Sequence, residues 1–126
     1  MFAYGTLRPG CGNDVMLGAY DHIGSATVPG LLAYHACGAF PVYLPDWVSG
    51  DVHGDVLLAD DREVANVMAM EVFAGYDAVW ADVTLGDGTT IECLTFPWRR
   101  GHHGDVIDNG DWTTTRHAYV PGRRHA

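Results

Sequence analysis

The sequence has no lysine and little charge of either sign. Its 126 residues carry a formal net charge of −9, only 18% of them are charged, and all seven basic residues are arginines. Globular proteins average about 25% charged residues, so few ions keep this chain in solution. Binding to a nucleic-acid backbone or to an anionic membrane surface requires a basic face, which so few cations do not provide. The composition therefore excludes nucleic acid and membranes as expected partners and favours an acidic domain that acts on something small.

Cysteines and long apolar runs are also scarce. Cys11, Cys37 and Cys93 form an odd, widely spaced set without a C-x-x-C pair, which argues against a disulfide-stapled secreted scaffold. The first residues lack the basic and apolar pattern of a signal peptide. The longest nearly uncharged stretch, residues 31–44, is shorter than the ~20 residues of a membrane-spanning helix. We therefore expect a cytoplasmic protein.

Glycine and proline are plentiful instead, and they divide the chain into short pieces. Sixteen glycines and six prolines favour short strands over long helices. Gly86-Asp87-Gly88 between two alternating runs predicts a hairpin. We expect one domain over residues 1–120, a loop at 99–111, a frayed tail at 121–126 and a short helical turn at 15–20. The predicted strands are residues 1–4, 23–36, 42–44, 51–58, 79–85 and 90–96, with breaks expected at Pro29-Gly30 and Pro41.

One segment has the pattern of a helix. Asp60 is a suitable N-cap, and Glu63 three residues later resembles the second half of a capping box. Apolar residues then follow at the spacing of one helical face, and the helix should end before Gly75. These residues are Val64, Val67 and Met68. One principal helix in a strand-rich chain predicts an α+β fold.

Glu71 breaks this apolar pattern, because it occupies the next position of the same face. A carboxyl group placed there would be desolvated, which raises its pKa toward neutrality. A general acid/base that works near pH 7 needs such a pKa. Alternatively, a small rotation of the helix would place Glu71 at the boundary, paired with an arginine. The spacing alone leaves both interpretations open.

The glycine-rich segment 4–13 is the second unusual feature. It follows a strand, so its backbone N–H groups could form an anion-binding nest. A phosphate-binding Walker loop is excluded, because Cys11-Gly12 stands where Lys-Ser/Thr is required. A tight turn at the end of a strand explains the same residues without any ligand.

Other reactive side chains suggest weaker hypotheses. Seven histidines invite a metal site, but no H-E-x-x-H or H-x₃-H spacing is present, so we predict none. The histidines considered are His35 beside Cys37, His53, and the pair His102-His103. Cys11 could pair with a histidine as a nucleophile, since stacked N–H groups lower a thiol pKa. A small residue that fills the loop is the simpler interpretation.

Several segments together resemble one protein family. The run Phe-Ala-Tyr-Gly-Thr-Leu-Arg-Pro-Gly at 2–10, followed by Gly12-Asn13, is similar to the opening signature of the gamma-glutamylcyclotransferase-like (AIG2-like) family. Glu71 matches the single acidic residue of the family's helix. Further matches, in the family's order, are Val28-Pro29-Gly30, Phe40-Pro41, Val52–Val56 and Asn109–Trp112.

The resemblance implies a fold and an activity. The fold is a small mixed β-barrel with one principal helix and short helical turns. The backbone amides of Gly5, Thr6 and Leu7 would hold the α-carboxylate of a γ-glutamyl group at the mouth of a pocket. Glu71 would move a proton from the α-ammonium to the leaving amine, so that a γ-glutamyl amine or peptide yields 5-oxoproline. No metal or organic cofactor is required.

The resemblance also names further residues, and it has departures. Tyr4, Arg8, Asn13 and Tyr76 are additional candidates for substrate binding, Arg8 and Asn13 also for holding the loop. A small polar ligand is the expected partner, with a homodimer as a further option. Trp80 and Asp82 stand near the family's aromatic and arginine, and Phe96 lacks a frequent hydroxyl. These departures keep open the alternative of a non-catalytic module that binds a small ligand in the same pocket.

Overall fold

The computed structural model describes residues 1–47 and 50–118, so the predicted tail 121–126 lies outside the described residues. One α-helix, α1 (Asp61–Phe73), and two 3-10 helices, η1 (Asn13–Leu17) and η2 (Trp112–Thr114), accompany the strands. The strands are β1 (Phe2–Ala3), β2 (Tyr20–Pro29), β3 (Leu31–Tyr34), β4 (Pro41–Leu44), β5 (Asp51–Ala59), β6 (Val79–Leu85) and β7 (Thr90–Thr95). This composition confirms the α+β class with one principal helix.

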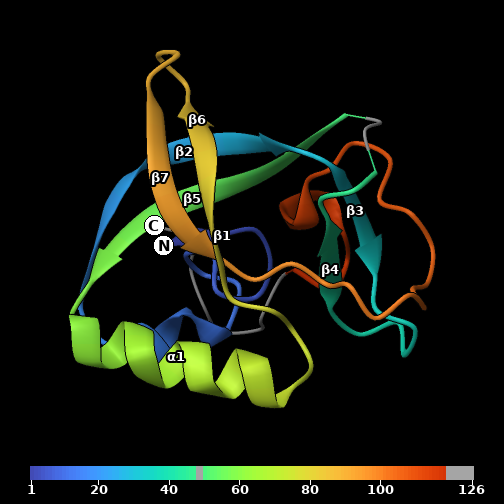
Figure 1. The fold of residues 1–126 in the computed structure, drawn as a ribbon, viewed down its shortest axis with the longest axis horizontal. Helices are drawn as coiled ribbons and strands as arrows, with labels where there is room; N and C mark the ends of the chain where they lie inside the picture. The colour runs from blue at the N-terminus through green and yellow to red at the C-terminus, as the bar shows by residue number, and fades with distance from the viewer. Residues whose placement is uncertain (48–49, 119–126) are drawn as a thin grey trace.

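The main sheet has five strands in the order β1-β5-β2-β6-β7, and β3 pairs with β4 in a separate two-stranded sheet. Figure 1 shows the long strands β2 and β5 bending across the molecule, with α1 beneath them and β3–β4 to one side. All ladders among the described strands are antiparallel, and the parallel contact is a single bridge between Tyr43 and Pro97. The small mixed β-barrel that the resemblance implies takes the form of a curled sheet, and no backbone ladder among the described strands closes it between β1 and β7.

The two edges of the curled sheet nevertheless meet through side chains. The Thr95 hydroxyl donates to the carbonyl oxygen of Phe2 over 3.4 Å, and the Tyr4 hydroxyl donates to the carbonyl oxygen of Phe96 over 2.6 Å. Because β1 is only two residues long, little backbone is left to extend a ladder to β7. Side-chain hydrogen bonds therefore connect the edges that a closed barrel would join by its backbone.

The predicted hairpin is confirmed. β6 and β7 pair in continuous register from Val79–Thr95 to Thr84–Thr90. Gly88 adopts a φ of 88° in the connecting turn, and its N–H donates to Leu85 over 2.9 Å. Two alternating runs around a glycine-rich turn were sufficient to predict this unit.

The break expected at Pro29-Gly30 is confirmed, and it divides the predicted segment 23–36 into two strands that belong to different sheets. Gly30 separates them, with a φ of 150° and its N–H donating to Gly50 over 2.9 Å. A Cβ atom at this position would lie 2.6 Å from the Tyr43 ring and 3.0 Å from the carbonyl oxygen of Leu44. Only glycine can turn the chain out of the main sheet at this point. This turn lets Leu31–Tyr34 pair with β4 above the end of the helix.

Helix α1 begins as predicted, with the Asp60 carboxylate accepting from the N–H of Arg62 over 2.9 Å. The expected return bond from Glu63 to Asp60 is absent from this described helix start, so the capping box is incomplete. Val67 is fully buried, whereas Met68 is 38% exposed. The buried face therefore runs through Val67 toward Glu71 and leaves Met68 at its edge. No helix in the described ranges is long and apolar enough to cross a membrane.

The buried apolar residues form two clusters. One includes Phe2 and Val28 of the main sheet together with Trp112 of η2. The other joins α1 to the two-stranded sheet and to the segment after β7 through Val67, Val42 and Phe96. Each fully buried side chain of this size contributes about 1.5–3 kcal/mol. The second cluster holds the helix against the glycine-rich loop and so positions the site described next.

Candidate active site

A cavity of about 360 Å³ lies between the glycine-rich loop, the end of α1 and the start of β4. Its walls are mostly apolar, and Glu71 is the one acid among the lining residues, none of which is basic. The lining residues are Phe2, Ala3, Tyr4, Gly5, Thr6, Leu7, Asn13, Ala39, Phe40, Pro41, Met70, Glu71, Ala74, Tyr76 and Phe96. Six of the seven predicted ligand-contacting positions and the predicted acid therefore meet in one cavity, and Arg8 is the exception.

Glu71 lies in the last turn of α1, half-buried, with its side chain at the cavity wall. Burial raises the pKa of its carboxyl group from 4.5 to about 7. None of the arginines and histidines in the described part of the chain forms an ion pair with it. The last turn of a helix is also the negative end of its dipole and offers no compensation for the carboxylate. Within the described residues Glu71 has no arginine partner, which favours the desolvated interpretation of Glu71 over the arginine-paired one.

Two tyrosines stand beside this carboxyl group. The Tyr4 hydroxyl donates to the carbonyl oxygen of Phe96 over 2.6 Å, and the Tyr76 hydroxyl donates to the carbonyl oxygen of Pro41 over 2.8 Å. Burial, with a smaller contribution from neighbouring groups that include Glu71, raises the pKa of both hydroxyls. Both tyrosines therefore stay neutral, and each hydroxyl donates its one hydrogen to a backbone carbonyl oxygen. Their oxygens have only lone pairs left to offer to a ligand.

The glycine-rich loop turns tightly at Gly5–Arg8, where the N–H of Arg8 donates to the carbonyl oxygen of Gly5 over 3.0 Å. Gly5, Thr6 and Leu7 line the cavity, and their N–H groups donate to no acceptor within residues 1–47 or 50–118. A Cβ atom on Gly5 would collide with the ring of Pro41, so glycine is required by space. Three successive free donors in one turn have the composition of an anion-binding nest.

Asn13 connects the far end of the loop to its centre. Its N–H donates to the carbonyl oxygen of Thr6 over 2.8 Å, and its side-chain amide donates to the Thr6 hydroxyl over 2.9 Å. The residue also lines the cavity, and most of its surface is exposed. Its contacts therefore support the turn, while its position leaves it within reach of a ligand.

Arg8 lies outside the cavity lining, although the sequence placed it among the substrate-binding residues. Its Nε donates to Asp55 over 2.7 Å, and its Nη1 donates to Asp111 over 2.9 Å and to the carbonyl oxygen of His53 over 3.4 Å. The residue is only 8% exposed. Its guanidinium is occupied by these partners, which favours the second predicted role, holding the loop, over contact with the substrate.

Sequence reasoning missed Asp55 and Asp111 as partners of this arginine. Asp55 also accepts from His22 over 2.8 Å, so one buried carboxylate receives two side chains. Both aspartates lie within segments that carried the family resemblance, which was the available signal. Their contact with Arg8 spans 47 and 103 residues of chain, and no local pattern records such a contact.

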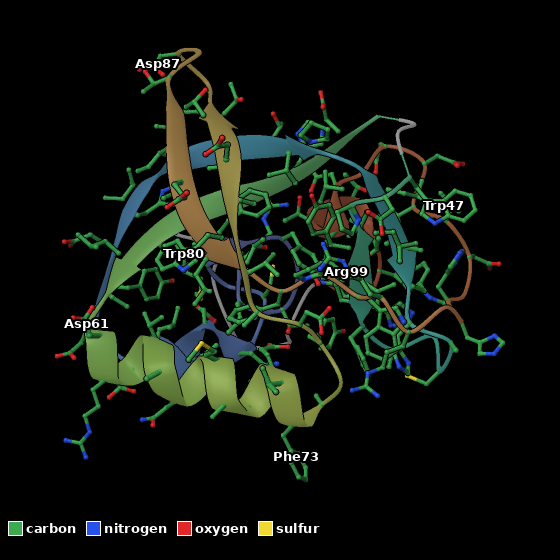
Figure 2. All side chains as sticks on the ribbon, viewed as in Figure 1. Trp47, Asp61, Phe73, Trp80, Asp87 and Arg99 are labelled. Carbon is green, nitrogen blue, oxygen red and sulfur yellow. The ribbon has the colours of Figure 1, made fainter. Side chains whose placement is uncertain are left out.

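The remaining reactive residues lie elsewhere. Cys11 is buried, and burial raises the pKa of its thiol to about 11, so the thiol stays protonated and is a poor nucleophile. In the described ranges no three His, Cys, Asp or Glu side chains gather as a metal site. Of the three departures, Trp80 and Asp82 are exposed outside the lining, and Figure 2 shows Trp80 on β6. Phe96 alone lines the cavity.

Comparisons with known proteins agree on one family. The family described as gamma-glutamyl cyclotransferase, AIG2-like, matches residues 1–114. AIG2-like protein B from Arabidopsis thaliana is 30% identical over 115 residues, which cover 89% of this chain and 64% of that protein. The chain thus spans slightly less than two thirds of the length of this relative.

Solved structures share the fold. An AIG2-like protein from Mus musculus superposes with a TM-score of 0.73 at 16% identity, over 100% of this chain and 96% of that one. A structure titled gamma-glutamyl cyclotransferase gives a TM-score of 0.68 at 14% identity, over 83% of this chain and 68% of that one. With its cavity, its helix acid and its glycine-rich loop, the chain belongs to the gamma-glutamyl cyclotransferase, AIG2-like family.

Proposed function

We propose that this protein cyclises a γ-glutamyl amine or γ-glutamyl peptide to 5-oxoproline and releases the amine. One observation carries the proposal: an unpaired carboxyl group with a pKa of about 7 faces a cavity that also holds three free backbone donors. Membership of the family supports this choice of reaction.

The polar groups of the cavity suit the two charged ends of a γ-glutamyl group. The N–H groups of Gly5, Thr6 and Leu7 bind its α-carboxylate, and no basic side chain among the lining residues competes for it. Hydrogen bonds to a charged group contribute about 1.5–3 kcal/mol each. The α-ammonium faces Glu71 and the hydroxyl oxygens of Tyr4 and Tyr76, which can only accept.

The reaction then needs one group that acts twice. The Glu71 carboxylate takes a proton from the α-ammonium, and the free amine attacks the γ-carbonyl carbon to form the new C–N bond of the ring. The tetrahedral intermediate collapses as the protonated Glu71 gives its proton to the departing nitrogen, and the original C–N bond breaks. The ring nitrogen loses its second proton to the solvent, and the released amine takes up a proton from the solvent to leave as an ammonium. A pKa near the working pH serves both steps. Because the attack is intramolecular, orientation of the substrate supplies much of the remaining rate enhancement.

The test is a product assay with matched variants. The protein is incubated with a panel of γ-glutamyl amines and γ-glutamyl peptides, and 5-oxoproline is measured. We expect product from the parent, a loss of at least about 100-fold in Glu71→Gln, and little change in Glu63→Gln. Glu63 is the matched control because it lies on the same helix outside the cavity lining.

Two results would overturn the proposal. Equal activity of the Glu71→Gln and Glu63→Gln variants would remove Glu71 from the chemistry. Tight binding of the panel compounds without turnover in the parent would instead support the non-catalytic ligand-binding module, for which the apolar Phe96 side chain in the cavity wall is the favouring observation.

A further inference from the structure

The Arg8 cluster consists of Arg8, Asp55, Asp111 and His22, and the reaction proposed above does not use it. Arg8 and Asp55 are each less than 10% exposed, and the Asp111 side chain is 28% exposed. Burying such charges is expensive unless they are well paired. Within this cluster the charges of Arg8, Asp55 and Asp111 are paired with one another.

The cluster ties three distant parts of the chain to the cavity loop. Arg8 is the last residue of the Gly5–Arg8 turn, whose other residues line the cavity. Asp55 belongs to the main sheet, in ladder with Ala3 and Ser25. Asp111 precedes η2, near the end of the described chain. The orientation of the turn therefore depends on anchors that lie outside the cavity.

Asp111 is itself held rigidly. Its carboxylate accepts from the N–H of Thr113 over 3.0 Å and from the Thr113 hydroxyl over 2.6 Å, in addition to Arg8. Burial alone would raise the pKa of Asp111, but the Thr113 hydroxyl and Arg8 together lower it, so the group stays ionised. Gly110 precedes it with a φ of 66°, and its carbonyl oxygen accepts from the N–H of His53 over 2.8 Å. This backbone bond fixes Asp111 beside β5.

Resting on the proposed function, we propose that Arg8 and Asp111 are positioning residues, whose ion pair orients the N–H groups of Gly5, Thr6 and Leu7 and thereby sets the affinity of the cavity for a ligand carboxylate. The pair touches neither the cavity nor the reacting atoms, so it acts through the turn alone. Its loss should weaken ground-state binding of the substrate and leave proton transfer by Glu71 unchanged.

The variants separate the ion pair from the fold of the Asp111 segment. Asp111→Asn keeps an oxygen for Thr113 but removes the charge that faces Arg8, and Asp111→Glu restores the charge. Thr113→Val removes the hydroxyl bond and leaves Arg8 paired. Asp87→Asn is the matched control. The Asp87 carboxylate accepts from the N–H of Thr89, two residues later, over 2.8 Å, as Asp111 does from Thr113, but Asp87 lies at the tip of the β6–β7 hairpin, away from the glycine-rich loop (Figure 2).

The first measurement is independent of turnover. Backbone amide shifts and ¹⁵N order parameters of Thr6 and Leu7 are recorded by NMR in each full-length variant. We expect altered shifts and lower order parameters at these residues in Asp111→Asn, a return toward the parent in Asp111→Glu, and no change in Thr113→Val or Asp87→Asn. Signals of Thr6 and Leu7 that coincide in Asp111→Asn and the parent would overturn the inference.

The second measurement divides KM from kcat. With a γ-glutamyl substrate that the parent converts, Asp111→Asn should raise KM about tenfold and leave kcat within about twofold, because the ligand carboxylate is misplaced. A purely structural role would lower the active fraction and the Tm without changing KM, and that result would overturn the inference while the proposed function stands. If the parent forms no 5-oxoproline from any substrate, the proposed function fails and the NMR result alone decides the positioning role.

Discussion

Glu71 is half-buried and Asp55 is buried, and the surroundings of these two acidic residues differ completely. Glu71 faces an apolar cavity without a cation, and burial raises its pKa to about 7. Asp55 accepts from Arg8 over 2.7 Å and from His22 over 2.8 Å. The short Gly5–Arg8 turn connects the two environments. Its first three residues line the cavity, and its last residue pairs with Asp55.

The difference separates two uses of a buried charge. An unpaired carboxyl group destabilises the fold, but it can exchange a proton near neutral pH. A carboxylate paired with arginine holds parts of the structure in place and is unavailable for chemistry. Both carboxyl groups lie next to the Gly5–Arg8 turn. The Arg8–Asp55 pair can therefore orient the backbone N–H groups of the turn toward the cavity that Glu71 faces.

Removal of the arginine should have the largest effect on stability. Arg8→Met preserves much of the side-chain volume but leaves Asp55 and Asp111 without their cation, so we expect a loss of about 3–5 kcal/mol in the free energy of unfolding. Arg99→Met is the control, since Arg99 lies 3.7 Å from Asp77 with both side chains about half exposed. Chemical denaturation measures both. Equal losses in the two variants would show that the Arg8 cluster behaves like a surface ion pair.

Neutralising Glu71 should raise the free energy of unfolding, in contrast to the loss in Arg8→Met, and the gain should depend on pH. The folded pKa of about 7 exceeds the unfolded value of 4.5, so the folded state binds more protons between these pH values and its stability falls as pH rises through them. Glu71→Gln removes this penalty. We expect it to be more stable than the parent by about 3 kcal/mol at pH 8, a gain that shrinks toward pH 4. Denaturation at both pH values, with Glu63→Gln alongside, measures the gain; a gain that does not vary with pH contradicts the prediction.

Gly5→Ala tests the packing of Gly5 against Pro41, at the start of the turn that joins the two environments. The added Cβ would collide with the Pro41 ring, so the loop or β4 must shift, at a cost of about 1–3 kcal/mol. Gly86→Ala is the control, because a Cβ there has open space around it. Thermal unfolding compares the variants, and a Tm of Gly5→Ala equal to that of Gly86→Ala would mean that the loop yields without cost.

Loss of His22 should have the smallest effect. Its side chain is 47% exposed, and exposed ion pairs contribute about 0–1 kcal/mol. We therefore expect His22→Ala to lose no more than about 1 kcal/mol, measured by the same denaturation experiment. A loss as large as that of Arg8→Met would contradict the prediction and show that His22 contributes as much as the arginine to holding Asp55 in place.

Local patterns were sufficient wherever local physics decides the structure. Alternation around Gly86–Gly88 predicted β6 and β7 nearly to the residue, and Asp60 predicted the start of α1. The position of Glu71 followed from helical spacing, because the same face that buries Val67 also carries Glu71. The prediction that Met68 belongs to the buried face was wrong, because Met68 lies at the edge of that face and is 38% exposed.

Local sequence patterns could not predict contacts between residues that are far apart in the chain. Asp55 and Asp111 reach Arg8 across 47 and 103 residues of chain, so no periodicity could indicate that the guanidinium points away from the cavity. Pro29-Gly30 predicted the break between β2 and β3, but the turn of β3 into a different sheet depended on the space beside Gly30, which Tyr43 and Leu44 occupy from another strand. The barrel remained open because β1 is too short to continue the ladder.

The pKa of Glu71 also means that the protein is not one chemical species at neutral pH. The formal charge of −9 counts Glu71 as ionised, but a group with a pKa of about 7 is protonated in about half of the molecules at pH 7. Two charge forms therefore coexist in comparable amounts and interconvert by a single proton. Each solution at neutral pH contains the base form ready to accept a proton and the acid form ready to donate one.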